Sequence, residues 1–236
     1  MSVNDKSIID ENEVAKLGFD PSRLQRVEER VKEDIAKGKC HGASIIAARH
    51  GKIALDITEG FSNLSEQKKL EPNSVFATMS VAKQFTNVLA LSLVERGLLY
   101  LHAPVCELIP EFATLGKEKV NLYHLLTHTS GIMSAIPPVS PEVLTNIEEL
   151  VKFACQLPLE NQPGERVNYS ILLGHSIIAA LCLKADGRGR SYSQMLHEDL
   201  FRPLGMKDTS LGAREDLMSR LCPVKVSYKD IAALLP

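Results

Sequence analysis

The sequence predicts an α+β fold, because one β-hairpin stands among several amphipathic helices. Apolar runs at residues 43–48 and 53–57 flank a short turn that contains Gly51, a pattern typical of a hairpin. Helical spacing of apolar side chains follows Asp20-Pro21 and again follows Lys83. Of the 236 residues, 44% are hydrophobic, which is enough to form a core.

The expected elements follow one another along the chain with clear start and stop signals. Residues 1–18 read as a polar lead-in, after which Asp20-Pro21 opens a helix that Gly38 ends. After the hairpin, a polar segment at 61–72 leads to the helix that carries Ser80. A short helix that runs into the turn at Gly131 is expected within residues 121–131. The remaining helical segments are expected at residues 105–109, 143–156, 172–184 and 191–201.

The stretch Ser80-Val81-Ala82-Lys83 opens a long helix that Gly97 ends. Side chains three apart on a helix share a face, so we expect the Lys83 amine to reach the Ser80 hydroxyl. A serine hydroxyl is a weak nucleophile, and a neighbouring amine that burial keeps partly neutral can take its proton. The helix N-terminus adds backbone N–H groups that favour a developing oxyanion. The apolar residues behind this motif are Phe85, Val88, Leu89, Leu91, Val94 and Leu98.

Ser-x-x-Lys alone is a weak signal, and the chain contains the pattern twice. The copy at Ser65 and Lys68 lies in a polar segment with no apolar helix behind it, so we interpret it as a solvated loop. For Ser80 the alternative is an N-cap residue whose hydroxyl satisfies a helix N–H group. The surrounding sequence has to decide between the two interpretations of Ser80.

Composition and charge narrow the function classes. The net charge of −2 gives no indication of a surface for nucleic acid. The polar start of the chain does not resemble a secretory signal, and no run of about 18 apolar residues indicates a membrane span. Five cysteines form an odd number without Cys-x-x-Cys pairing, which favours reduced thiols. We therefore expect a cytoplasmic protein.

His124 and His128 are four residues apart on a short predicted helix, which suggests a zinc site of the His-x-x-x-His type. A helical metalloprotease site needs a glutamate after the first histidine, and Leu125 stands there. A metallohydrolase is therefore the least favoured alternative. We expect both histidines to hydrogen-bond in a packed turn, and we expect no metal or cofactor.

Several segments together resemble a known family. They are residues 74–86, 93–97, 125–131, Pro163-Gly164, Tyr169-Ser170 and residues 201–206. In this order and at this spacing, over about residues 20–212, they resemble the serine β-lactamase-related hydrolases. That family includes class C β-lactamases, DD-peptidases and related esterases and transacylases.

The resemblance implies a β-lactamase/transpeptidase-like fold, in which a helical region accompanies an antiparallel sheet sandwiched by helices. It makes Ser80 the acylated nucleophile and Lys83 its proton partner. Tyr169 matches the tyrosine of the family's Tyr-x-Asn motif, which assists proton transfer to and from the serine. The implied activity is carboxylesterase or acyl-transfer chemistry on a small ester or amide, without a cofactor.

Two departures from the family pattern bear on this expectation. Ile171 replaces the asparagine of Tyr-x-Asn, which weakens the case for β-lactam chemistry more than the case for ester chemistry. The family's third motif, Lys-Thr-Gly or His-x-Gly, has no counterpart after Ser80. The resemblance assigns to that strand an oxyanion donor, and removing one such donor typically costs about 10²–10³ in rate.

We therefore expect a single domain, residues 1–236, that lacks the family's C-terminal strands and closing helix. Its α/β part would span about residues 20–60, and its helical region, with the catalytic helix, about residues 61–212. Residues 213–236 form a tail that we leave unassigned. The expected partners are a small substrate and either a second copy of the chain or a complementing C-terminal segment. The alternative function is a non-catalytic scaffold, or an inactive truncated form, of the same fold.

Overall fold

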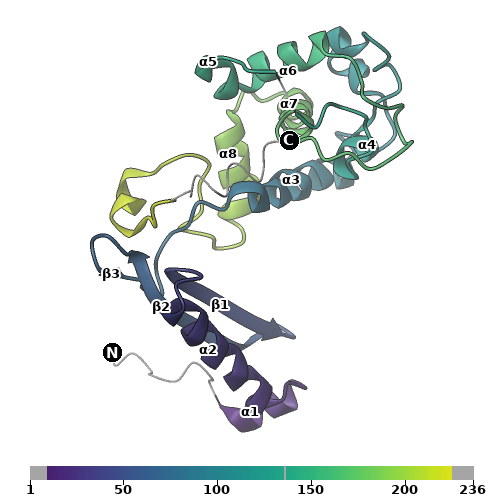
Figure 1. Cartoon of the computed structure of the whole chain (residues 1–236). Helices are drawn as coiled ribbons and strands as arrows, with labels where there is room; N and C mark the ends of the chain where they lie inside the picture. The colour runs from purple at the N-terminus through teal and green to yellow at the C-terminus, as the bar shows by residue number, and fades with distance from the viewer. Residues whose placement is uncertain (1–9, 136, 225–236) are drawn as a thin grey trace. The chain divides into compact units, whose positions relative to one another are not determined.

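A computed structural model of the chain describes residues 10–135 and 137–224. The described backbone divides into two compact units, one within residues 1–77 and 214–236 and the other within residues 78–213 (Figure 1). The first residues and the end of the expected tail lie outside the described part. The division comes later than the expected boundary near residue 60, because the antiparallel sheet continues beyond that point. Whether the two units form one domain stays a prediction.

The first unit contains a three-stranded antiparallel sheet in the order β1-β2-β3. Its strands are β1 (Gly42–Arg49), β2 (Lys52–Asn63) and β3 (Lys68–Lys69). The predicted hairpin is confirmed, and His50 and Gly51 both have positive φ, as a two-residue hairpin turn of matching twist requires. A bulge between Ala47 and Ala48 shifts the register. Both Ala54 and Leu55 are buried beside that shift.

Helix α2 (Pro21–Ala36) packs on the hairpin and begins as predicted, with Asp20 as its N-cap (Figure 1). The prediction of a polar lead-in at residues 1–18 is incomplete, because helix α1 (Glu11–Lys16) forms within it. The Asp10 carboxylate caps α1, and its Val14 side chain is buried in the same cluster as α2. The 3-10 helix η5 (Glu215–Arg220) belongs to this unit, within the tail that the sequence left unassigned.

The second unit is helical. Its elements are η1 (Met79–Ala82), α3 (Lys83–Glu95), η2 (Val105–Glu107), η3 (Pro110–Phe112), α4 (Leu122–Leu126), α5 (Pro141–Leu144), α6 (Ile147–Gln156), α7 (Leu173–Asp186), α8 (Tyr192–Leu196) and the π-helix η4 (His197–Phe201). The expected helix at 143–156 is in fact two helices. The Asn146 side chain accepts hydrogen bonds from Glu148 N and Glu149 N, and this N-cap starts α6 afresh.

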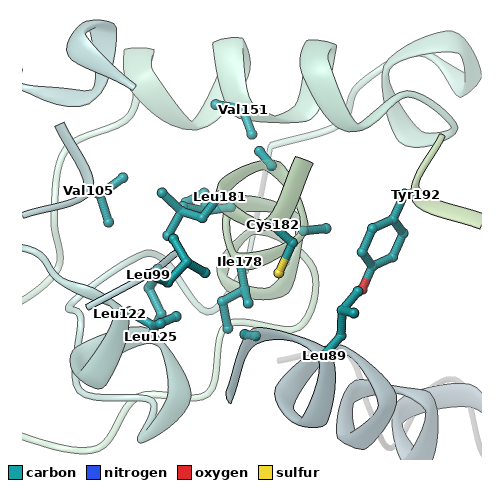
Figure 2. Close-up of a cluster of buried hydrophobic side chains, with 14 of the residues drawn as sticks. Leu89, Leu99, Val105, Leu122, Leu125, Val151, Ile178, Leu181, Cys182 and Tyr192 are labelled. Carbon is teal, nitrogen blue, oxygen red and sulfur yellow. The ribbon is translucent and has the colours of Figure 1, made fainter. Parts of the chain in front are cut away.

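Helix α7 is the centre of this unit, and its residues from Leu173 to Cys182 are all buried. Side chains from α3, α4, α6 and α8 surround it, as Figure 2 shows for Leu89, Leu125, Val151 and Tyr192. A helix that is apolar all round needs neighbours on every side. This packing positions α3, which follows η1 directly, and α7; η1, the start of α3 and the residues just before α7 carry the three predicted catalytic side chains.

Candidate active site

Ser80 lies in the short 3-10 helix η1, which runs directly into α3. The N-cap position of η1 is Thr78, so the alternative of Ser80 as a capping residue is wrong. The Lys83 ammonium nitrogen lies 3.3 Å from Ser80 Oγ and donates to it, one helical turn along the chain. Met79, immediately before the serine, has a φ of +47°, which is costly for a side chain with a Cβ. Backbone strain of this kind is common beside reactive groups.

Tyr169 is held between two anchored neighbours. On one side, Asn168 N donates to the carbonyl oxygen of His128 at 2.7 Å. On the other side, the buried Ser170 hydroxyl accepts from Gly174 N at 2.8 Å and so fixes the start of α7. The Tyr169 hydroxyl donates to Ser80 Oγ at 2.9 Å. Lys83 and Tyr169 therefore both lie within hydrogen-bonding distance of Ser80 Oγ.

The environment of Tyr169 favours its phenolate. Hydrogen bonding with Lys83 is the largest cause that lowers the pKa of the Tyr169 phenol below its ordinary value of 10, and hydrogen bonding with Ser80 is the next. Partial burial opposes them. A nearby cation is what a tyrosine needs in order to act as a base. Lys83 supplies that cation.

Three further side chains lie behind this group, and sequence reasoning did not assign them to it. The ring of His128 meets the ring of Tyr169 at 4.9 Å, and the ring of His175 lies 5.5 Å from that of His128. Nε2 of His175 lies 3.0 Å from the Asn87 side-chain oxygen. Asn87 follows Lys83 by four positions on α3, and this spacing was the one available signal.

The loop that carries His128 contains two residues with positive φ, a backbone conformation that most side chains disfavour. His128 itself has a φ of +57°, and Gly131 has a φ of +74°. A Cβ at Gly131 would lie 2.0 Å from the carbonyl oxygen of Asn161. Hydrogen bonds from Glu160 N to the Gly131 oxygen and from Gly164 N to the Thr129 oxygen hold residues 128–131 against residues 160–164.

The two histidines of the zinc hypothesis have different surroundings. Burial lowers the pKa of His124, whose Nδ1 atom is buried without a hydrogen-bond partner. The contacts that the structure gives the His128 side chain are with rings, where the sequence led us to expect hydrogen bonds. Across residues 10–135 and 137–224, no group of three or more His, Cys, Asp or Glu side chains is arranged to hold a metal ion.

The second Ser-x-x-Lys copy contrasts with the first. Ser65 and Lys68 lie in and beside an exposed turn between β2 and β3, which confirms the interpretation as a solvated loop. The Lys68 ammonium group donates to the carbonyl oxygen of Ser219 at 2.6 Å. In the copy that opens a helix, by contrast, the lysine donates to the serine hydroxyl.

A family model described as Beta-lactamase matches residues 27–223. The chain belongs to the Beta-lactamase family. The resemblance that the sequence motifs indicated is thereby confirmed.

Relatives of this Beta-lactamase family chain include "Protein flp" of Staphylococcus aureus (strain MW2), which is 27% identical over 193 residues. That match covers 79% of this chain and 38% of the staphylococcal protein. "Esterase EstB" of Burkholderia gladioli is 28% identical over 191 residues, covering 74% of this chain and 48% of the esterase. The chain thus spans less than half the length of either curated relative.

A solved structure of a penicillin-binding protein homologue from Caulobacter crescentus has a TM-score of 0.77 with this Beta-lactamase family chain. The two are 23% identical, and the match covers 88% of this chain and 55% of the other. The predicted fold class is therefore confirmed. Among the described helices, none is both long enough and apolar enough to cross a membrane.

Proposed function

We propose that this chain is a serine hydrolase that works through an acyl-enzyme on Ser80, with a small ester as its main substrate class and amides as a second. The observation that carries the proposal is the convergence of the Tyr169 hydroxyl and the Lys83 ammonium group on Ser80 Oγ, at 2.9 Å and 3.3 Å. Membership of a family with an esterase among the chain's relatives supports it.

The acylation step follows from this geometry. Tyr169, as phenolate, takes the proton of Ser80 while Oγ attacks the acyl carbonyl carbon. Backbone N–H groups at the start of the Ser80 helix favour the negative charge on the carbonyl oxygen. The bond to the leaving group then breaks, Tyr169 returns the proton to that group as it departs, and the acyl ester of Ser80 remains. Lys83 stabilises the negative charge on Tyr169 during the step.

The second half-reaction uses the same groups in the opposite direction. Tyr169 takes a proton from a water molecule or an acceptor alcohol, whose oxygen attacks the acyl carbonyl carbon. When the bond to Ser80 breaks, the proton passes from Tyr169 to Oγ and restores the hydroxyl. Water gives hydrolysis and an alcohol gives acyl transfer. Ile171, where the family motif has an amide side chain, favours esters over β-lactams as substrates.

The five cysteines are all free thiols, which fits a reducing cytoplasm as the site of action.

The test is the intact mass of the protein after incubation with a fluorophosphonate, which phosphonylates an activated serine. We expect one adduct on the wild type and none on Ser80→Ala. Ser65→Ala is the matched control, because Ser65 belongs to the same sequence pattern without the same surroundings. An adduct that persists in Ser80→Ala contradicts the proposed nucleophile.

A non-catalytic scaffold of the same fold is the second candidate, and one observation favours it. Ile171 is 61% exposed beside Tyr169, so the motif position presents an apolar group where family enzymes have an amide. A folded wild-type protein that takes no label, together with self-association in light scattering, would support the scaffold. Stoichiometric labelling of Ser80 would exclude it.

A further inference from the structure

Six residues of the second unit form a ring around Ser80 Oγ, in which the link from Lys83 to Asn87 is the backbone of α3 and the other links are side-chain contacts. It begins at Ser80, continues along α3 through Lys83 to Asn87, crosses to His175 on α7, and passes to His128. From there it reaches Tyr169, whose hydroxyl returns to Ser80. The family chemistry needs three of these residues. The other three connect them.

Each connection in the outer part of the ring has a defined geometry. The Asn87 side-chain oxygen lies 3.0 Å from Nε2 of His175, which ties α7 to α3 one turn beyond Lys83. The His175 and His128 rings are tilted by 36° at 5.5 Å. The His128 and Tyr169 rings meet edge-to-face, at 63° and 4.9 Å, a geometry that aromatic rings prefer.

Both imidazoles lie in surroundings that keep them neutral. Burial is the larger cause that lowers the pKa of His128, and the positive charge of Lys83 is the second. The same two causes, followed by the charge of His128, lower the pKa of His175 to about 4. The titratable groups that face the pair are Lys83 from α3 and Tyr169 from the segment before α7. Asn87 is the polar neutral group on the α3 side.

We propose that His128 and His175 are positioning residues of the Ser80 reaction, two neutral imidazoles that set the place of the Tyr169 ring relative to Lys83 and Ser80. This inference rests on the proposed acyl-enzyme function. Tyr169 sits in a non-helical segment and is 41% exposed, so its own backbone does not fix the ring. The imidazole of His128 supports the ring from behind. His175 and Asn87 tie that support to the helix that carries the lysine.

A proton on either imidazole changes this arrangement. Two positive charges would then lie close together, because Lys83 is the charged neighbour of both rings. Their repulsion moves Tyr169 or Lys83 away from Ser80 Oγ. A displacement of about 1 Å in such a group can cost on the order of 10²-fold in rate. The six-residue ring should therefore slow Ser80 acylation in acid more steeply than protonation of Tyr169 alone would.

The first experiment measures the rate of Ser80 labelling by a fluorophosphonate. His128→Ala should slow labelling about 10- to 100-fold, because the support for the Tyr169 ring is lost. His128→Phe should retain most of the rate, since it keeps a ring that cannot titrate. His102→Ala is the control, because His102 is an exposed histidine elsewhere in the same unit. Equal rates in wild type and His128→Ala would overturn the proposal.

The pH profile separates positioning from general destabilisation. In the wild type, the plot of log rate against pH should steepen at a pH below the ordinary histidine pKa of about 6.5, because burial and the Lys83 charge lower the pKa of His128 from that value. In His128→Phe that extra slope should be smaller or absent. The folded fraction is measured at each pH by circular dichroism, and each rate is divided by it, so that loss of folded protein does not contribute to the slope. An unchanged slope in His128→Phe counts against the inference.

A second readout does not depend on activity. The ring protons of the histidines are followed by NMR as the pH is varied, in the wild type and in Lys83→Met. Removing the Lys83 charge should raise the pKa values of His128 and His175. His124 should stay unchanged, because Lys83 is not among the groups that shift it. If the wild type takes no label at all, the proposed acyl-enzyme function fails. The titration still tests the positioning proposal: if the pKa values of His128 and His175 do not change in Lys83→Met, the proposal is overturned.

Discussion

The ammonium nitrogen of Lys83 lies 5.2 Å from the centre of the Tyr169 ring while it also donates to Ser80 Oγ. One cation therefore acts on two hydroxyl groups that are 89 positions apart in the chain. It lowers the pKa of the Tyr169 phenol, which is what the proposed role of Tyr169 as the base for Ser80 requires. In the proposed mechanism the work is divided between two residues: Lys83 supplies charge, and Tyr169 supplies the base.

These proposed roles predict how Lys83 affects the dependence of the Ser80 labelling rate on pH. The labelling rate of Ser80 should rise with pH and level off near the pKa of Tyr169, which lies below 10. In Lys83→Met the hydrogen bond and the charge are both lost, so the rise should move toward pH ~10, the ordinary value for tyrosine. Lys68→Met, in the exposed copy of the motif, should leave the profile unchanged. A rise that stays in place in Lys83→Met would show that Lys83 does not set the tyrosine pKa.

Tyr169→Phe is the most selective test of the proposed base. It removes the hydroxyl that lies 2.9 Å from Ser80 Oγ and keeps the ring that packs on His128. General bases contribute about 10²–10⁴-fold, so labelling should slow by at least about 100-fold at neutral pH. Tyr100→Phe changes an exposed tyrosine of the same unit and should have no effect. A rate close to wild type in Tyr169→Phe would assign the base to another group.

Local sequence patterns predicted most of the elements, because their signals are short-range. The cap at Asp20 and the turn at Gly51 determine local backbone geometry, and both appear in the structure. Fine detail within a helix was less predictable. Val88 and Leu91 of α3 are 48% and 46% exposed, although their apolar character suggested the buried face. The face of α3 that packs depends on where α7 lies, which only tertiary structure decides.

In the candidate site, too, the sequence identified residues that are close in the chain and missed those that only the tertiary structure brings together. Ser80 and Lys83 are one turn apart, and the family resemblance added Tyr169. His175 could not be assigned, because a histidine inside the apolar run of α7 has no sequence feature that indicates its neighbour. His128 was noticed for its spacing from His124, which suggested zinc. Its actual neighbours are Tyr169 and His175, which the chain brings together from distant positions.

Gly131→Ala tests the loop that carries His128. The new methyl group would overlap the carbonyl oxygen of Asn161, and the backbone is in a left-handed conformation that alanine disfavours. Gly187→Ala is the matched control, because Gly187 has a φ of +61° with open space around it. The conformational cost alone is about 1–2 kcal/mol in the free energy of unfolding. Chemical denaturation should show a clearly larger loss for Gly131→Ala, and equal losses would mean that the contact with Asn161 is absent.

His175 should make the stability of the protein depend on pH. Its pKa is about 4 in the folded chain, against an ordinary value near 6.5, so between these values the unfolded chain binds a proton that the folded chain does not. The free energy of unfolding therefore falls as the pH drops from about 6.5 to about 4, and below that range the contribution is constant. A shift of this size corresponds to a loss on the order of 3 kcal/mol.

His175→Gln removes the titrating group and keeps a side-chain amide that can donate to Asn87. Urea denaturation at several pH values should show a flatter curve between pH 6.5 and 4 for this variant than for the wild type. His102→Gln, at an exposed position, should follow the wild type. Carboxylates such as Asp186 also lose favourable interactions in acid, but they do so in all three proteins and cancel in the comparison. Parallel curves for wild type and His175→Gln would mean that His175 takes up its proton in the folded chain as readily as in the unfolded one.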